Sequence, residues 1–380
     1  MKRRSWPWLV GIVIATGGCF FLLSTRFLPS AASRDLDHRG FQLLGTVIQL
    51  IKYDYVEEPD PAKIMDGAFR GLVDSLDILS SYLDPVQAAK YGQALKAPFR
   101  EAGLVIIKSY GGFPEVVGLV ENSPAEKAGL KPGDFISSID NRSTFGLSLI
   151  ETRLALKSPA SGAMKLKVLR QTQTLFLTVE RGLPAPEPVA FSPAAGTAGV
   201  LRVLRFQAPA AEQTNQTLGA RLKDRKHPLI LDLRNCAEGD LEEARRFLNL
   251  FLKTDKAGVF QKRQGPPEPL ACPEKAAWDQ VPLVVWTNVG TQGPAELVAG
   301  VLQDFHRAKV VGLTTAGLTA STRLLSLEDG SALLLTSGVF VLNSGKKVWG
   351  QGVKPDREVA FMDTGRDIYL KKSFELLSSR

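Results

Sequence analysis

The sequence predicts an α/β and β protein of several domains, and three patterns along the chain support this prediction. Apolar residues recur at helical spacing between residues 34 and 98. Short β-like runs dominate residues 99–181. From residue 200 onwards, apolar strand-like runs alternate with helical segments, which is typical of an α/β core. The chain has 380 residues and is therefore long enough to bury more than one hydrophobic core.

Residues 1–33 are predicted to form a signal-anchor or a signal peptide. Three basic residues, Lys2, Arg3 and Arg4, precede an uncharged stretch from Trp8 to Leu23. This stretch is long for a cleaved signal and slightly short for an untilted membrane span, so both alternatives stay open, and we favour the anchor. Basic residues preferentially stay in the cytoplasm, which would place the body of the protein outside it.

Residues 34–98 read as an N-terminal helical region, with Phe41, Leu44 and Val47 on one helical face. Asp60-Pro61 marks a turn or the start of a second helix.

The later boundaries follow from changes in pattern. Residues 99–181 contain the strand-like runs and one helical stretch near Leu149 to Leu156. Residues 182–199 are rich in Pro, Ala and Gly, which indicates a linker. Residues 200–362 form the predicted α/β core, and residues 363–380 a mostly polar C-terminal tail.

Composition excludes several classes of protein. Hydrophobic residues make up 44% of the chain and charged residues 23%, which is ordinary for a globular protein. Part of the net charge of +8 belongs to the N-terminal basic residues, and the chain has no long basic run, so nucleic acid is not a predicted partner. The histidines His38, His227 and His306 are scattered, and neither a metal site nor a cofactor is predicted.

Cys236 and Cys272 are the cysteines of the predicted exported part. An oxidising compartment would permit a disulfide between them, and two free thiols are the alternative.

Eight segments of the chain carry a resemblance to a known family. They are YVEE at Tyr55, SLDILSSYLDP at Ser75, SPAEKAGLKPGDFISSID at Ser123, LILDLRN at Leu229, AELVAGVLQD at Ala295, AKVVG at Ala308, LEDGSALLLT at Leu327 and GQGVKPD at Gly350. In their order and spacing they resemble the carboxyl-terminal processing, or tail-specific, serine peptidases, from Leu43 to Val359. The resemblance implies a PDZ-like domain inserted before a ClpP/crotonase-like α/β peptidase core. It also implies a place in the bacterial cell envelope, anchored in the inner membrane with the body in the periplasm or extracytoplasmic space.

The segment at Ser123 resembles a PDZ domain. The resemblance implies that Glu101 to Leu104 form the loop that receives a peptide carboxylate in such domains. The implied peptide-binding residues are Ala102, Gly103, Leu104, Val105 and Ile106. Because Glu101 replaces a glycine of the family pattern, its charge is expected to repel a carboxylate. Peptide binding and a purely architectural role both stay open.

The family's catalytic residues are not found at the matching positions. Relatives use a serine nucleophile, a lysine base and a glutamine that orients the lysine. Gly290 to Glu296 aligns with the pattern Gly-Ser-Ala-Ser-Ala-Ser-Glu, which places Gly293 at the serine. The resemblance likewise places Leu318 at the lysine and Thr322 at the glutamine.

The oxyanion hole implied by the resemblance is altered as well. Pro294 follows the nucleophile position and has no N–H to donate. In the loop Cys236-Ala237-Glu238-Gly239, Gly239 is retained, whereas Glu238 brings a negative charge near the place where an oxyanion would form.

These substitutions predict an extracytoplasmic pseudopeptidase that binds polypeptides, acts as a scaffold or regulates an active paralogue. The alternative is a serine-type endopeptidase with a relocated nucleophile, for which Thr291, Ser321 and Cys236 are candidates. Predicted partners are polypeptide C-termini or unfolded extracytoplasmic proteins, an active peptidase paralogue, and the membrane through the N-terminal segment. Homodimerisation through Leu43 to Leu83 is implied by the resemblance, and intramolecular packing of those helices is the alternative.

Overall fold

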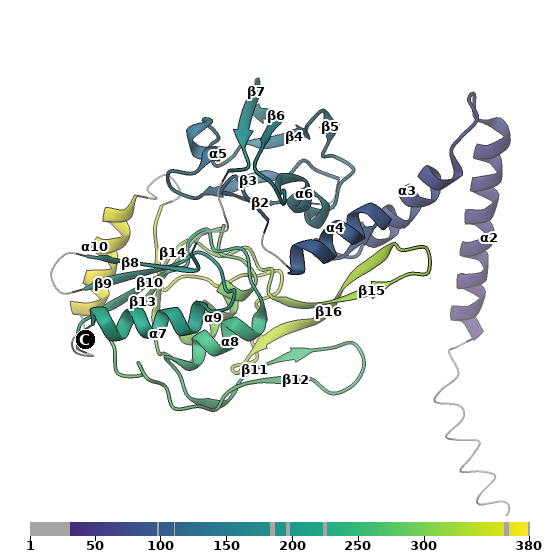
Figure 1. The fold of residues 1–380 in the computed structure, drawn as a ribbon. Coiled ribbons are helices and arrows are strands. Elements are labelled where there is room, and N and C mark those ends of the chain that lie inside the picture. Colours follow the sequence, from purple (N-terminus) through teal and green to yellow (C-terminus); the bar gives the residue numbers. More distant parts are fainter. Residues whose placement is uncertain are drawn as a thin grey trace, which may run out of the picture. The chain divides into compact units, whose positions relative to one another are not determined.

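The chain divides into two compact units, residues 1–68 and residues 69–380 (Figure 1). The computed structural model describes residues 31–96, 99–109, 111–182, 187–194, 198–222, 226–360 and 365–378. The predicted signal segment therefore lies outside the described residues except for its last three positions. Within these ranges, none of the helices has the length and apolar character needed to span a membrane.

The first unit is helical, as predicted. It contains α2 (Ala31–Asp54) and the beginning of α3 (Pro61–Asp74). The carboxylate of Asp60 accepts the backbone N–H of Ala62 at 3.0 Å, which satisfies a free donor in the first turn of α3. Several apolar side chains of α2 are exposed, among them Phe41, Leu43, Leu50 and Tyr53.

The predicted helical region also contains a strand. After α3 come β1 (Ser81–Leu83) and α4 (Pro85–Lys96). All three residues of β1 are buried, and β1 pairs antiparallel with β16 (Ala332–Leu342). The helical interpretation of residues 34–98 is therefore wrong at β1, because a distant strand satisfies the backbone groups of this segment.

Residues 99–181, which are predicted to form a PDZ-like domain, contain a β-sheet and two helices. Its strand order is β2-β3-β4-β6-β7, with β5 beside β4. The strands are β2 (Leu104–Ile107), β3 (Glu115–Leu119), β4 (Phe135–Ile139), β5 (Arg142–Ser143), β6 (Ala163–Arg170) and β7 (Gln173–Glu180). Helices α5 (Pro124–Lys127) and α6 (Leu149–Leu156) begin after the capping residues Ser123 and Ser148.

The peptidase-like core is built on a mostly parallel sheet of order β17-β14-β13-β10-β9-β8. Its strands are β8 (Val189–Pro193), β9 (Gly199–Val203), β10 (Leu229–Asp232), β13 (Leu283–Thr287), β14 (Lys309–Gly312) and β17 (Arg357–Glu358). Only the edge strand β8 runs antiparallel to its neighbour among the described pairs. Because β8 falls within residues 182–199, the predicted linker is wrong at this strand.

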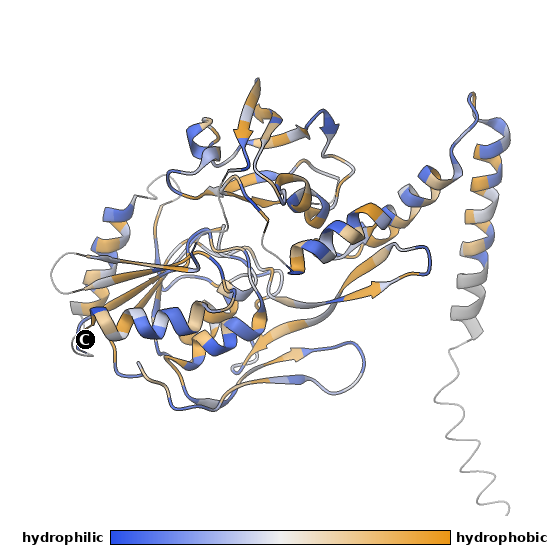
Figure 2. Cartoon of the chain, viewed as in Figure 1, coloured by the Kyte–Doolittle hydropathy of each residue, from blue (hydrophilic) through white to orange (hydrophobic). Residues whose placement is uncertain are grey.

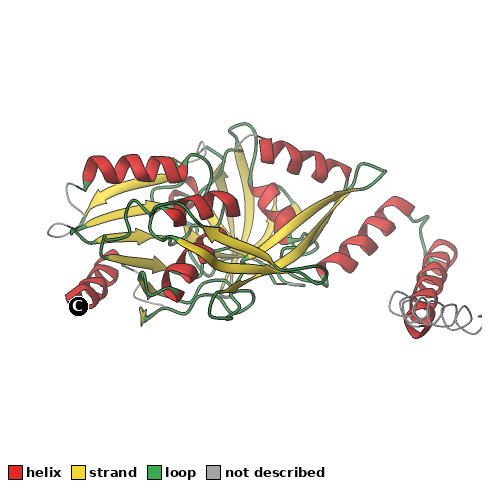
Figure 3. Cartoon of the chain, turned by 90° about the horizontal axis from the view of Figure 1, so that it is seen from below, coloured by secondary structure: helices red, strands yellow, loops and turns green. Residues whose placement is uncertain are grey.

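Alternate residues of the central strands bury against opposite layers of helices, as expected for a sheet covered on both faces (Figure 3). Leu229 and Leu231 belong to the cluster formed with α7, α8 and α9, whereas Ile230 belongs to the cluster formed with α10. These helices are α7 (Ala210–Arg221), α8 (Leu241–Asn249), α9 (Pro294–Asp304) and α10 (Arg366–Ser378).

The C-terminal tail is a docked helix and not a free polar segment. Tyr369 of α10 is fully buried and donates its hydroxyl to the carbonyl of Thr287 at 3.0 Å. Ser373 accepts the indole N–H of Trp286 at 2.8 Å, and the Trp286 and Tyr369 rings pack with centroids 5.3 Å apart. The polar composition of the tail is misleading because α10 still carries enough apolar side chains, among them Ile368, Leu370 and Leu376, to pack against the core sheet.

A second core sheet has the order β1-β16-β11-β12, with β15 paired to β16. Its remaining strands are β11 (Thr254–Gln261), β12 (Glu268–Cys272) and β15 (Ala320–Ser326). The central strands β10 and β13 and most of β16 are hydrophobic and appear orange in Figure 2. Cys236 and Cys272 are both buried free thiols.

We expect Tyr369→Ala to lower the free energy of unfolding by ~3–5 kcal/mol, because it removes a buried aromatic ring beneath α10. Tyr369→Phe keeps the ring and removes one hydrogen bond, so it should cost only ~0.5–1.5 kcal/mol. Denaturant unfolding measures both values. Equal effects of the two variants would contradict the role assigned to ring packing.

Candidate functional site

The segment that matches the family's nucleophile pattern connects β13 to α9. Gly293 immediately precedes α9 and adopts φ 53° and ψ −111°, a backbone conformation that favours glycine. Pro294 is the first residue of the helix, where its missing N–H would have had no intrahelical partner. The local sequence therefore suits a sharp turn into a helix.

The carboxylate of Glu296 is the centre of this turn. It accepts hydrogen bonds from the backbone N–H groups of Gly293, Gly317 and Leu318 and from the hydroxyls of Thr315 and Thr319. The Glu296 residue is completely buried. Burial raises the pKa of its carboxyl, and the hydrogen bonds oppose that rise.

These bonds fasten residues 315–319 against the beginning of α9 and bring two predicted catalytic positions together. A Cβ placed on Gly293 would have the carbonyl oxygen of Leu318 as its nearest neighbour, at 3.7 Å. The space above Gly293 is therefore open. The Leu318 side chain is buried in the hydrophobic cluster that includes Leu79 and Leu156.

Five of the positions that the resemblance assigns to the catalytic and oxyanion region line one cavity of about 400 Å³. They are Gly239, Gly293, Pro294, Leu318 and Thr322. The apolar wall is made by Leu79, Tyr91, Ile150, Leu241, Ala320 and Leu334, and the other polar side chains are Arg153, Asp240, Gln292 and Ser321. The volume lies in the range of ligand-binding pockets, ~300–1,000 Å³. We call this cavity the core pocket.

The hydroxyl and thiol groups considered as substitute nucleophiles lack a base. Thr291 is buried and donates its hydroxyl to the carbonyl of Leu233 at 2.8 Å. Ser321 lines the core pocket, and the hydrogen-bond partners of its hydroxyl among the described residues are the Ser337 hydroxyl and the carbonyl of Gly338.

The remaining candidates are unsuitable for different reasons. Cys236 is fully buried, and burial raises the pKa of its thiol, which keeps it protonated. His306 is exposed beyond the end of α9 and lines neither pocket described in this section. In the described part of the chain, no group of histidine, cysteine and acidic side chains could hold a metal ion.

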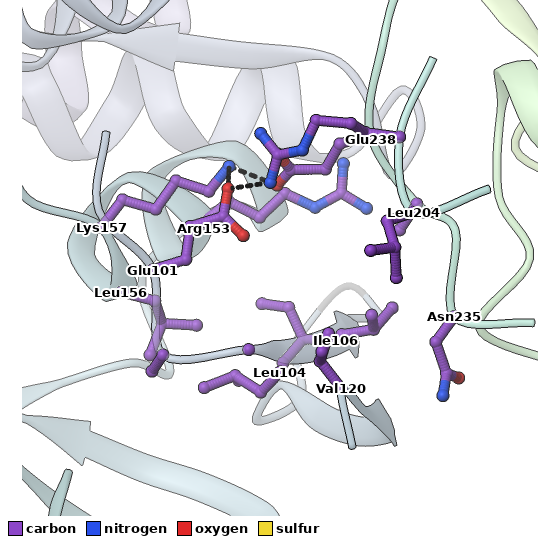
Figure 4. Close-up of a pocket in the computed structure, with 15 residues that line it drawn as sticks. Glu101, Leu104, Ile106, Val120, Arg153, Leu156, Lys157, Leu204, Asn235 and Glu238 are labelled. Atoms are coloured by element: carbon purple, nitrogen blue, oxygen red, sulfur yellow. Dashed lines mark hydrogen bonds and ion pairs between the residues drawn. The ribbon is translucent and has the colours of Figure 1, made fainter. Parts of the chain in front are cut away.

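The predicted peptide-binding residues line a second, much smaller cavity of about 50 Å³, which we call the PDZ pocket (Figure 4). Ala102, Gly103, Leu104, Val105 and Ile106 form one side of it. Core residues cover the other side, namely Leu204, Arg205, Asn235, Ala237 and Glu238. A space of this size holds a few water molecules, each needing about 10–15 Å³.

A cluster of charges joins the PDZ domain to the core at the edge of this pocket (Figure 4). Arg205 of the core donates to Glu101 at 2.8 Å, and Lys157 of the PDZ domain pairs with Glu238 of the core and with Glu101 at 3.6 Å. Glu101, expected from the sequence to present a repelling charge, is thus paired with two cations.

The pKa values of the Glu238 and Glu101 carboxyls shift in opposite directions. Burial disfavours ionisation of Glu238, but Lys157, Arg205 and Arg153 outweigh it and lower its pKa to about 2. Burial and the nearby charge of Glu238 raise the pKa of Glu101.

Two amide side chains make further contacts across the PDZ–core boundary. The side chain of Gln292 accepts from Arg153 at 2.5 Å and donates to the carbonyl of Ile106 at 3.3 Å. Asn235 donates to the carbonyl of Leu119 at 3.0 Å.

Arg153, Lys157, Arg205 and Gln292 were missed by sequence reasoning. One signal was available, because Gln292 stands where the family pattern quoted above has alanine. The other three are ordinary surface-type residues whose positions depend on how the two domains dock.

The comparisons with known proteins agree with this architecture. Residues 197–359 match the family model of peptidase family S41, and residues 115–170 match that of the PDZ domain. The chain is 26% identical over 364 residues to the carboxy-terminal processing protease CtpA of Bacillus subtilis (strain 168), covering 95% of this chain and 78% of that protein.

Two further matches extend the comparison. The carboxy-terminal-processing protease of Bartonella bacilliformis is 27% identical over 359 residues, with coverage of 91% of this chain and 81% of that protein. The solved structure of the photosystem II D1 C-terminal processing protease shares the fold, with a TM-score of 0.68, 23% identity, and coverage of 84% of this chain and 86% of that chain.

We expect Glu296→Gln to destabilise the chain by at least ~2 kcal/mol, because the amide turns a donor toward buried N–H and hydroxyl donors. Glu242→Gln is the control: Glu242 is an exposed residue of α8, and its loss should change the free energy of unfolding by about 0.5 kcal/mol or less. Denaturant unfolding of both variants tests this, and a neutral Glu296→Gln would contradict the role of the carboxylate.

The depressed pKa of Glu238 predicts a pH dependence. Its ionised form stabilises the folded state above the usual pKa of 4.5, and this stabilisation is lost as the pH falls toward about 2. At pH 7 we expect Glu238→Gln to lower the free energy of unfolding by about 1–2 kcal/mol, since a third of the side chain is exposed and solvent screens the pair.

The difference between the wild type and Glu238→Gln should disappear near pH 2. Glu101 gives the opposite pH trend because its pKa is raised, and part of that rise comes from the charge of Glu238. The difference between the two proteins therefore reports the interacting pair of Glu101 and Glu238. Unfolding curves recorded between pH 2 and pH 7 measure it. A difference that does not vary with pH would refute the assigned ion pair.

Proposed function

Because this chain is a homologue of the carboxy-terminal processing proteases, with a peptidase family S41 core and a PDZ domain, we propose that it binds polypeptides without cleaving them. It acts as a pseudopeptidase that holds extracytoplasmic polypeptides or regulates an active relative. The core pocket is the observation that carries this proposal, since it combines a ligand-sized volume with side chains that cannot perform the family's chemistry.

Three positions of the core pocket lack the chemical groups that the family's mechanism requires. Gly293 offers no nucleophile, and Leu318 offers an apolar group where a base would be needed. Pro294 has no N–H for an oxyanion. Loss of a serine nucleophile alone can cost a factor of ~10⁶ in turnover, so the combined substitutions leave binding as the function of the pocket.

The competing function is proteolysis through a relocated nucleophile. Ser321 is its best candidate, because its hydroxyl lines the core pocket. The described contacts of this hydroxyl are Ser337 and the carbonyl of Gly338, and neither is a base.

We further propose that residues 1–33 anchor the chain in the inner membrane, with the body in the periplasm or extracytoplasmic space. The basic residues before the uncharged N-terminal stretch support this orientation. The exposed apolar side chains of α2 support homodimerisation through the N-terminal helices. Accessibility to a protease added outside the cytoplasmic membrane tests the location.

The purified full chain is expected to bind an unfolded polypeptide with an apolar C-terminus and to leave it intact. Fluorescence anisotropy measures binding, and mass spectrometry of the same sample detects cleavage. A fluorophosphonate probe should not label the chain, because an unactivated hydroxyl reacts too slowly.

Ser321→Ala is the matched control. Cleavage or labelling by the natural chain that disappears in Ser321→Ala would overturn the proposal and establish a relocated nucleophile. Cleavage that persists in Ser321→Ala would direct the search to Thr291. Absence of both binding and cleavage would reject polypeptide binding.

A further inference from the structure

The strand β7 is an open edge of the PDZ sheet. Among the described strands it pairs only with β6, in a continuous register without a shift. It contains no proline, and its only charged residue is Glu180 at the last position. Phe176, near its middle, is 79% exposed. Such an edge presents unpaired backbone N–H and C=O groups to any extended chain that approaches it.

The other sheet edges in the described part of the chain carry features that oppose such pairing. Proteins commonly protect an edge by shortness, proline, charge or an irregular register. The edge strands β8 and β12 contain Pro193 and Pro269, and β15 has a shift in register and the charge of Arg323. The strands β1, β2, β5 and β17 have four residues or fewer. The long and regular edge of β7 is the exception, which favours a strand that is covered in the assembled protein.

The β6–β7 hairpin determines which backbone groups of β7 point outward. Arg170 and Gln173 flank a two-residue turn and form a hydrogen-bonded pair, and the two kinds of antiparallel pair alternate from there. The odd-numbered residues of β7 therefore direct their N–H and C=O groups toward β6. The even-numbered residues direct theirs away from the sheet, and their side chains are exposed, namely Thr174, Phe176, Thr178 and Glu180.

We propose that β7 pairs antiparallel with β7 of a second copy of this chain, with the two Phe176 residues opposite each other on a two-fold axis. In this register Thr174 of each copy lies opposite Thr178 of the other. Aromatic pairs and Thr–Thr pairs are among the cross-strand pairs that stabilise antiparallel sheets. On the other face of the sheet, Leu175 lies opposite Leu177 of the other copy. Both leucines are only half-buried in the single chain, so the pairing removes further apolar surface from water.

A second copy fits this edge better than a foreign strand, because the edge is complementary to itself under a two-fold rotation. Uncharged residues face each other from Thr174 to Thr178. The exposed lysines of β6, Lys165 and Lys167, lie one strand away from the seam. The two Lys167 residues are then three strand spacings apart, roughly 14 Å, which exceeds the screening length of ~8 Å at physiological ionic strength.

This pairing leaves the candidate site uncovered. The strands β2 and β7 are the two ends of the strand order of the PDZ sheet, and β7 lines neither the PDZ pocket nor the core pocket. In Figure 1, β7 lies at the top of the PDZ domain, on the side away from the core sheets. Two copies would share one continuous sheet and keep their pockets accessible. The inference goes beyond the proposed function and does not depend on it.

Oxidative cross-linking of the purified full chain tests the register. The chain carries Thr174→Cys and Thr178→Cys in a Cys19→Ser background, and Cys236 and Cys272 are kept because both are buried. Opposite residues of a hydrogen-bonded pair have Cα atoms ~5.5 Å apart, which is within reach of a disulfide. The double variant should therefore give a cross-linked dimer as its main product.

The two single-cysteine variants are matched controls. Thr178→Cys alone places the two thiols ~13 Å apart along the strands, too far for a disulfide, and the same holds for Thr174→Cys. Their yields of dimer should be at least tenfold lower than the yield of the double variant.

A second pair of variants tests the role of Phe176. Adding Phe176→Glu to the double variant sets two like charges opposite each other and should lower the yield of dimer at least fivefold. Phe145→Glu, at another exposed phenylalanine that lies outside β7, should leave the yield unchanged. Denaturant unfolding should show that Phe176→Glu folds as the wild type does, because this side chain is exposed in the single chain.

Four outcomes would contradict the inference. Little cross-linking of the double variant would show that this edge does not pair with itself. Efficient cross-linking of either single variant would replace the register. A yield that Phe176→Glu leaves unchanged would remove Phe176 from the seam. Preferential cross-linking of the double variant to an added unfolded polypeptide that contains a cysteine would assign the edge to a foreign strand.

Discussion

The hydrogen bonds to the Glu296 carboxylate hold the candidate site together. They connect the first turn of α9 with residues 315–319, a segment that lies between β14 and β15. Without this acceptor, several buried donors would be left unpaired, each at a cost of ~1–3 kcal/mol. The position of Leu318 depends on these bonds, and so does the wall that Leu318 contributes to the core pocket.

The hydrogen bonds of Glu296 also affect the PDZ domain. Leu318 is packed in the hydrophobic cluster of that domain, so the segment that Glu296 fixes also supports the PDZ fold. Around this apolar contact lie the polar contacts of Glu101, Glu238 and Gln292. All three residues depart from the family pattern, and all three now join the PDZ domain to the core. These three residues thus supply polar contacts across the boundary between the two domains.

Local patterns allow much of the fold to be predicted from the sequence. The buried strand β10 is a continuous apolar run, and the turn before α5 carries its own capping serine, so neither depends on distant residues. The strand β8 and the helix α10 were missed for the opposite reason. Each is polar or rich in Pro and Ala in isolation, and each becomes ordered only against the core sheet.

The residues of the candidate site likewise divide into those that local patterns predict and those whose role depends on distant contacts. The positions Gly293 and Leu318 follow from motif spacing, because Glu296 and the helix after it preserve the register of the pattern. Arg153 could not be predicted in this way. Whether Arg153 has an acidic partner depends on which carboxylates pair with Lys157 and Arg205 when the two domains dock. No local pattern in the sequence encodes these pairs.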